Sequence, residues 1–162
     1  WSTSGDEWLA AQALGGNGQM SKITKEVLAE KSYVGIIKHP PLTEKEIAAF
    51  RARREVLLEG LRKEYPSGEI TLYRGVGGAY AKKFGSGTDL PVYSLSSWST
   101  SPGVAREFAK GKNGSVFETK VSVNDVWSTG EAAKAGAILR VVDQGGEFVI
   151  LSKDVSRKVR RL

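Results

Sequence analysis

The sequence contains no cysteine and only one histidine, His39, which lies in a Pro-rich stretch. These absences argue against thiol chemistry, a Ser-His catalytic triad and a zinc site. No apolar run approaches the roughly 20 residues that a membrane-spanning helix needs. The N-terminal residues Trp1 to Glu7 also lack the basic and then apolar order of a signal peptide. We therefore expect a soluble protein that needs no metal and contacts no membrane.

Length and composition predict one compact domain over residues 1–162, because 40% of the 162 residues are apolar. The chain begins at Trp1 and not at Met, which suggests a segment of a longer polypeptide. The net charge of +6 is concentrated near the end, where one acidic residue, Asp154, stands among several basic ones. The basic residues are Lys153, Arg157, Lys158, Arg160 and Arg161. Such a strip either binds nucleic acid or an acidic protein, or forms a solvated terminal strand.

Residues 1–65 are predicted to be mostly helical. Two capping-box pairs mark helix starts, Ser4 with Glu7 and Thr43 with Glu46. Apolar residues recur at helical spacing after the second pair and up to Tyr65, which makes this the strongest helical pattern of the chain. A further short helix is expected over Lys22–Glu30, and Gly- and Pro-rich stretches separate the three.

From Glu69 onward the pattern changes to short β-rich runs divided by glycine. The predicted strands are Ile70–Arg74, Val92–Ser99, Val116–Val123, Ile138–Val142, Glu147–Leu151 and Val155–Leu162. Helices come first and strands follow, with no regular βαβ alternation. This order predicts an α+β domain with mainly antiparallel pairing, in which residues 69–162 form the mostly β part.

The first strand carries an inward-pointing charge. Alternation puts Arg74 on the same face as the core residues Ile70 and Leu72. An inward arginine needs an anion, and its guanidinium suits a carboxylate or a phosphate group. Arg74 therefore belongs either to a buried Arg-Glu pair or to an anion-binding site. Gly75, directly after it, permits a ligand to approach the backbone closely.

The second strand of interest ends at Ser99 and turns sharply into a short helix. Ser101 is well placed as the N-cap, and Gly111 suits the C-terminal stop. Ser99 is not needed for capping, so its hydroxyl either bonds to a neighbouring strand or serves a site. Trp98 and Phe108, on either side of the turn, are typical core residues.

A third polar residue, Glu147, begins the apolar strand that follows the glycine turn Asp143–Gly146. Taken alone, it could be a charge left at a strand edge. In this order, however, Arg74, Ser99-Thr100-Ser101 and Glu147 resemble the arginine, Ser-Thr-Ser and glutamate signature of the bacterial-toxin-like ADP-ribosyltransferases. The resemblance covers roughly residues 47–151. It implies a helical N-terminal part followed by two packed, mainly antiparallel β-sheets around an NAD cleft.

The resemblance also implies a role for each motif, with NAD as co-substrate. Arg74, Gly75 and the triplet Ser99-Thr100-Ser101 would bind NAD: Arg74 would hold a phosphate, and the Gly75 backbone would hold the nicotinamide carboxamide. Ser99 would orient Glu147 and the nicotinamide ribose. Glu147 would accept a hydrogen bond from the ribose 2′-OH and stabilise the oxocarbenium ion that develops as nicotinamide leaves. The catalytic residues implied are therefore Glu147, Ser99 and Arg74.

One position departs from the family pattern. Family members that modify protein arginine carry a glutamate two residues before the catalytic one, and several others carry a glutamine, but here the residue is Gly145. Gln144 and Asp143 lie close by and could replace it only if the loop bulges. The acceptor side thus consists of Gln144, Gly145 and Asp143, and the acceptor is either RNA or protein.

The sequence therefore predicts a mono-ADP-ribosyltransferase toxin domain that cleaves NAD and modifies a macromolecule. The alternatives are an NAD glycohydrolase, in which water captures the ribose, and a non-catalytic basic module that binds nucleic acid. We expect a monomer that is delivered as the C-terminal part of a larger secreted or injected bacterial effector and acts in the target-cell cytoplasm. A cognate immunity protein that plugs the cleft is an expected partner.

Overall fold

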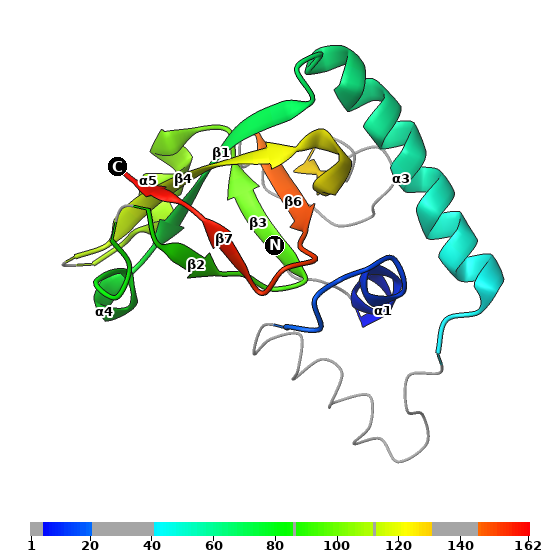
Figure 1. Cartoon of the computed structure of the whole chain (residues 1–162), viewed down its shortest axis with the longest axis horizontal. Helices are drawn as coiled ribbons and strands as arrows, with labels where there is room; N and C mark the ends of the chain where they lie inside the picture. Colours follow the sequence, from blue (N-terminus) through cyan, green and yellow to red (C-terminus); the bar gives the residue numbers. More distant parts are fainter. Residues whose placement is uncertain (1–4, 21–40, 86, 112, 131–145) are drawn as a thin grey trace.

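A computed structural model of the chain describes residues 5–20, 41–85, 87–111, 113–130 and 146–162 (Figure 1). The helix predicted at Lys22–Glu30, the strand predicted at Ile138–Val142 and the predicted capping residue Ser4 lie outside these residues. Within them the protein is an α+β structure with antiparallel sheets, as predicted.

The helices include α1 (Gly5–Ala13), α3 (Glu44–Glu64), α4 (Gly78–Ala81) and α5 (Pro102–Phe108). The capping box predicted at the start of α3 is confirmed. Thr43 Oγ1 accepts a hydrogen bond from the Glu46 N–H at 3.3 Å, and the Glu46 carboxylate accepts one from the Thr43 N–H at 2.7 Å. These bonds hold the pKa of Glu46 below its ordinary value, the backbone bond from Thr43 being the larger cause. No described helix is long and apolar enough to cross a membrane.

Replacing Thr43 by alanine should lower the free energy of unfolding by about 0.5–2 kcal/mol, the usual cost of a lost N-cap. Urea denaturation at neutral pH measures the loss. Glu46→Gln is the control, because glutamine keeps an accepting oxygen and should lose less. A lowered pKa stabilises the fold above the unfolded pKa, and this contribution disappears as the pH falls through the folded pKa. Alanine keeps the backbone N–H that bonds to Glu46, and the bond from the Glu46 N–H to Thr43 Oγ1 does not titrate, so the gap between wild type and Thr43→Ala should narrow only in part in acid. A gap that widens there would contradict this account of the cap.

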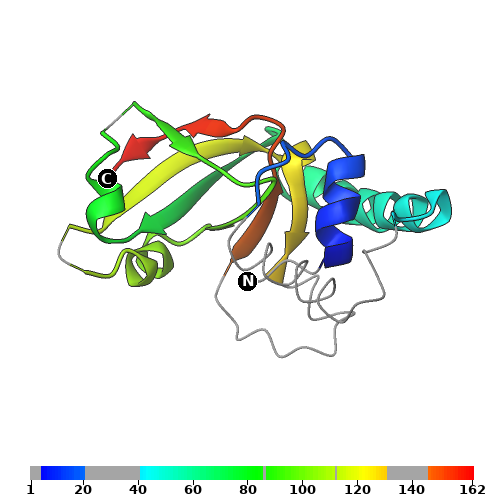
Figure 2. The ribbon, with the colours of Figure 1, turned by 90° about the horizontal axis from the view of Figure 1, so that it is seen from below.

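The strands form a six-stranded sheet of order β5-β6-β3-β1-β4-β8 and a two-stranded sheet of β2 and β7, with every pairing antiparallel. Their bounds are β1 Glu69–Val76, β2 Asp89–Pro91, β3 Leu95–Ser99, β4 Ser115–Ser122, β5 Val126–Thr129, β6 Glu147–Leu151, β7 Ser156–Lys158 and β8 Arg160–Arg161. The small sheet lies over β1 and β4 (Figure 2). The two layers meet through Leu90 of β2 and Phe117 of β4, which belong to one core cluster.

Two of the predicted strands are wrong in extent. The strand predicted at Val92–Ser99 begins only at Leu95, because the Val92 N–H bonds to Val155 O and the Ser94 N–H bonds to Gln19 O. The strand predicted at Val155–Leu162 is divided at Val159. Its first part pairs with β2 and its second part pairs with β4. The helix α5 also ends at Phe108, before the predicted stop at Gly111.

The six-stranded sheet consists of two halves that share one residue pair. Between β1 and β3 only Tyr73 and Ser99 are in register, whereas β1 pairs with β4 along its whole length and β3 pairs with β6 throughout. Figure 1 shows β3 and β6 running across the direction of β1 and β4. The two half-sheets therefore separate beyond Tyr73 and leave a wedge between β1 and β3.

The helices α1 and α3 pack against the half-sheet of β3, β5 and β6. Phe50 of α3 stacks on Trp127 of β5, with ring centroids 6.1 Å apart. The core cluster around these rings consists of Ala10, Ala11, Leu95, Trp127, Val149 and Leu151. Farther along α3, Leu58 and Leu61 belong to the core cluster of Leu90 and Phe117, which also contains Ile70, Leu72 and Trp98. The predicted inward face of the first strand, Ile70 and Leu72, is confirmed.

Candidate active site

A small pocket of about 190 Å³ occupies the wedge between the two half-sheets. Strand β1 contributes Tyr73, Arg74 and Gly75 to its wall, and β3 contributes Ser97, Trp98 and Ser99. Val104, Ala105 and Phe108 of α5 and Glu147 of β6 complete the lining. Four segments that are far apart in the sequence thus meet at the point where β1 leaves β3.

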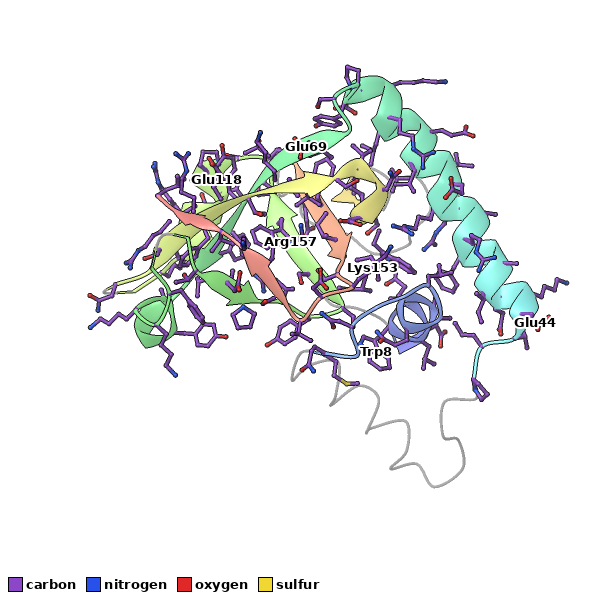
Figure 3. The ribbon with its side chains drawn as sticks, in the orientation of Figure 1. Trp8, Glu44, Glu69, Glu118, Lys153 and Arg157 are labelled. Atoms are coloured by element: carbon purple, nitrogen blue, oxygen red, sulfur yellow. The ribbon has the colours of Figure 1, made fainter. Side chains whose placement is uncertain are left out.

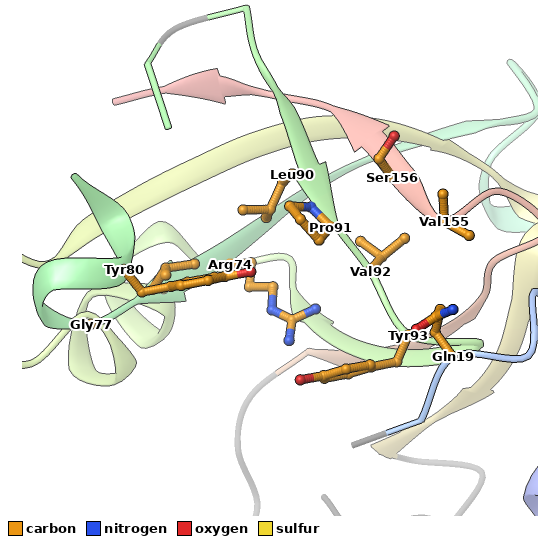
Figure 4. Close-up of a pocket in the computed structure, with 12 residues that line it drawn as sticks. Gln19, Arg74, Gly77, Tyr80, Leu90, Pro91, Val92, Tyr93, Val155 and Ser156 are labelled. Carbon is orange, nitrogen blue, oxygen red and sulfur yellow. The ribbon is translucent and has the colours of Figure 1, made fainter. Parts of the chain in front are cut away.

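A larger pocket of about 610 Å³ adjoins the small one, because Arg74 and Gly75 line both. Tyr80 of α4, Tyr93 and the side chains of β2 form much of its wall. Figure 4 shows the guanidinium group of Arg74 pointing into this pocket, between the labelled side chains of Tyr80 and Tyr93. Arg74 therefore stands at the junction of two adjoining cavities.

The guanidinium group of Arg74 has no anionic partner among the described residues. Its Nη1 atom is buried and makes no hydrogen bond, and no described carboxylate forms an ion pair with it. The ring of Trp98 lies beside it, with its centroid 5.7 Å from Cζ of Arg74. Burial lowers the pKa of Arg74, and the neighbouring Tyr93 and Tyr80 oppose that shift. A buried Arg-Glu pair, one of the two alternatives for this residue, is not observed.

Arg157 of β7 shows what a structural arginine looks like in the same fold (Figure 3). It also lies largely inside the protein, with 19% of its side chain exposed, but it faces the carboxylate of Asp125 at 3.9 Å. Burial lowers its pKa, and Asp125 and Asp154 oppose the shift. Arg74 differs from Arg157 in having two tyrosines where Arg157 has two carboxylates. In contrast to Arg157, Arg74 thus has no described carboxylate beside it and can receive an anionic ligand.

Gly75 is required by the packing of α5 on β1. A Cβ at this position would overlap the carbonyl oxygen of Ala105 and lie 2.7 Å from the amide nitrogen of Ala109. The sequence indicated close approach of a ligand at Gly75, but the space next to its Cα holds the backbone of α5. The backbone of α5 therefore lies directly against β1 at Gly75, where it covers the small pocket.

Gly75→Ala should consequently destabilise the protein by about 3 kcal/mol, because backbone atoms cannot move aside as a flexible side chain can. Gly60→Ala is the matched control, since nothing lies within 4 Å of a Cβ at Gly60 in the middle of α3. There alanine should stabilise the helix by about 0.5–1 kcal/mol. Thermal unfolding of both variants measures the difference. Equal melting temperatures would show that α5 does not pack on β1 in this way.

Ser99 and Glu147 face each other on neighbouring strands. They are opposite residues in the antiparallel register of β3 and β6. Opposite residues in such a pair have Cβ atoms about 4.5–5.5 Å apart, so both side chains project from the same face of the sheet. Glu147 is 8% exposed and Ser99 is 6% exposed, and both line the small pocket. The serine and the carboxylate are thereby held together on one wall.

The strand-to-helix turn after Ser99 is held by its own polar groups. Ser99 Oγ accepts a hydrogen bond from the Ser101 N–H at 3.0 Å, and Ser101 Oγ accepts one from the Val104 N–H at 3.3 Å as the N-cap of α5. The Thr100 N–H donates to Gly146 O at 3.0 Å. Gly146 has a φ of 74°, and a Cβ there would overlap Thr100 Oγ1. The triplet therefore ties α5 to the turn that delivers Glu147.

The structure brings together four of the predicted site residues, Arg74, Gly75, Ser99 and Glu147. Thr100 and Ser101, predicted to bind NAD, line neither pocket and fix the turn instead. The predicted acceptor-side residues Asp143, Gln144 and Gly145 lie outside the described residues.

The sequence did not single out Tyr80 or Tyr93 as site residues. Tyr80 lies on a helix of four residues that has no apolar periodicity, and Tyr93 lies inside a run predicted as strand. Phe108, expected in the core, is 55% exposed and lines the small pocket. Exposed aromatic rings next to an arginine are the signal that only the assembled structure provides.

In the described part of the chain no three His, Cys, Asp or Glu side chains are grouped so that they could hold a metal ion. The two pockets are lined by the polar side chains of Arg74, Ser99 and Glu147 and by the aromatic rings around them. A comparison of the chain with protein-family models, with curated proteins and with solved structures finds no match.

Proposed function

We propose that the protein cleaves NAD at the bond between nicotinamide and ribose and transfers ADP-ribose to a macromolecular acceptor. One observation carries the proposal: a buried guanidinium without an anionic partner stands beside a serine and a carboxylate on neighbouring strands. These are Arg74, Ser99 and Glu147. Their order along the chain is that of the ADP-ribosyltransferase signature.

The two adjoining pockets suit the parts of an NAD molecule. Their volumes, about 610 and 190 Å³, fall together within the range of about 300–1,000 Å³ that is usual for ligand sites. The pyrophosphate supplies the anion that Nη1 of Arg74 lacks. The adenosine part would occupy the larger pocket. The nicotinamide ribose would then lie in the small pocket with Ser99 and Glu147.

In the proposed reaction the C1′–N bond of the nicotinamide ribose breaks, and its electron pair leaves with nicotinamide. Positive charge develops on the ribose, and the carboxylate of Glu147 stabilises it while accepting a hydrogen bond from the 2′-OH. Ser99 holds the carboxylate and the ribose in register. An oxygen or nitrogen of the acceptor bonds to C1′ and releases its proton to solvent.

Incubation with NAD labelled in its adenylate phosphate, in the presence of a whole-cell extract, tests the proposal. Label should appear in macromolecules, and separate RNase and protease treatments then identify the acceptor as RNA or protein. Release of free ADP-ribose at a rate that the extract does not change would instead indicate an NAD glycohydrolase. If no nicotinamide is released, the proposal is wrong, and salt-dependent nucleic-acid binding would then favour a non-catalytic basic module.

A further inference from the structure

Two segments beside the larger pocket carry lysines that have no carboxylate partner among the described residues. The segments 75–88 and 108–117 contain Lys82, Lys83 and Lys110 and not one acidic residue. All three lysines are exposed, and no described carboxylate forms an ion pair with any of them. Elsewhere on the surface, Lys120 and Arg160 are paired with Glu69 and Glu118. Exposed Asp89 and Glu107 stand just outside these segments, so this part of the surface is predominantly basic.

The two segments that carry these lysines approach each other beside the larger pocket. Figures 1 and 2 both place α4, α5 and the C-terminus at one end of the molecule. The carbonyl oxygen of Lys110 lies 3.0 Å from where a Cβ on Gly77 would stand, and Gly77 lines the larger pocket. Lys83 Nζ lies 5.9 Å from the centroid of the Tyr80 ring, which lines the same pocket.

The C-terminal strand adds a further basic group to this end. Arg161 of β8 donates a hydrogen bond of 3.5 Å to the carbonyl oxygen of Phe84, the residue that follows Lys83. Arg161 is exposed. We call Lys82, Lys83, Lys110 and Arg161 the basic rim.

Three exposed aromatic rings line the two pockets beside the basic rim. Tyr80 is 48% exposed and Tyr93 is 41% exposed at the larger pocket, and Phe108 is 55% exposed at the small one. Basic groups that follow a phosphate backbone, together with rings on which bases stack, are the two elements that bind single-stranded nucleic acid. An acidic protein would use the lysines but not the rings, and a duplex keeps its base faces inside.

We infer that the basic rim and these three rings bind a single strand of nucleic acid. The inference deepens the proposed function, on which it rests in one respect: it makes the bound strand the acceptor of ADP-ribose. Binding itself requires no catalysis. NAD also combines phosphate with an aromatic ring, so the test must separate the strand from NAD.

The test is fluorescence anisotropy of the full chain with a fluorescein-labelled oligouridylate of about 15 nucleotides, matched to the usual site sizes. The variant Lys82→Gln/Lys83→Gln/Lys110→Gln should bind it about tenfold or more weakly. The slope of log K against log salt should become shallower by about 2, because each neutralised phosphate of a single strand contributes about 0.7. The control Lys45→Gln/Arg51→Gln/Lys63→Gln removes the same charge from exposed positions along α3 and should bind as the wild type does.

Three results would overturn the inference. One is an absence of oligonucleotide binding by the wild type, and another is equal loss in both triple variants. The third is oligonucleotide binding that the rim variant retains while its KM for NAD rises, which would assign the rim to NAD. If the oligonucleotide binds the wild type and not the rim variant, but the wild type does not cleave NAD, the basic rim is supported and the proposed function is rejected.

Discussion

Glu147→Gln is expected to lower the rate of nicotinamide release about 100- to 1,000-fold while NAD binding persists. Glutamine keeps the shape of the side chain and an accepting oxygen, so the ribose 2′-OH retains a partner. It removes the negative charge, and that charge matters only as the ribose becomes cationic. The loss should therefore appear in kcat and not in the dissociation constant. Chromatography of released nicotinamide and calorimetric titration with NAD measure the two quantities.

Glu118→Gln is the matched control for this experiment. Glu118 is also a partly buried carboxylate on the six-stranded sheet, but it pairs with Arg160 at 2.9 Å and lines neither pocket. Its loss should leave turnover unchanged. If Glu147→Gln released nicotinamide at the wild-type rate, Glu147 would not be the catalytic carboxylate.

Local sequence patterns predicted several elements of the fold, including strands that carry site residues. The spacing of Thr43 and Glu46 predicted the start of α3, because a capping box closes within one helical turn. Alternation along β1 predicted that Arg74 shares a face with Leu72, because successive side chains of a strand point to opposite faces. The strand Glu147–Leu151 was predicted with its observed bounds. In each case the deciding interaction lies within a few residues.

The geometry of the site could not be predicted, because it depends on pairings between distant segments. No local signal says that β1 and β3 share only the pair Tyr73 and Ser99, which creates the wedge. Equally, no local signal says that the terminal strand leaves β2 for β4 at Val159. The lack of a partner for Arg74 is a property of the whole neighbourhood, and so it appears only in the folded chain.

Arg74→Met should reduce the stabilisation of the protein by NAD without lowering the melting temperature of the free protein. In the free protein the Nη1 atom is buried without a hydrogen bond, and its contact with Trp98 offsets only part of the desolvation cost. An apolar side chain of similar length removes that cost. The melting temperature should rise by about 2–4 °C, which corresponds to about 1 kcal/mol in a chain of this size.

The same substitution removes the hydrogen bonds to the pyrophosphate. Hydrogen bonds to charged groups contribute about 1.5–3 kcal/mol, so NAD should bind about 10- to 150-fold more weakly. Scanning fluorimetry at several NAD concentrations measures both effects, because a ligand that binds only the folded state stabilises it by RT ln(1 + L/Kd), where L is the concentration of free ligand.

Arg157→Met separates a ligand-binding arginine from a structural one. Removal of Arg157 breaks its ion pair with Asp125, so the melting temperature should fall, while the shift produced by NAD should remain. Arg74→Met should raise the melting temperature of the free protein and reduce the shift produced by NAD. If Arg74→Met unfolded at a lower temperature and still responded to NAD, Arg74 would be a structural residue and the anion site would lie elsewhere. Opposite changes of the melting temperature in the two variants would mean that the buried charge of Arg74 destabilises the free protein and serves to bind the ligand.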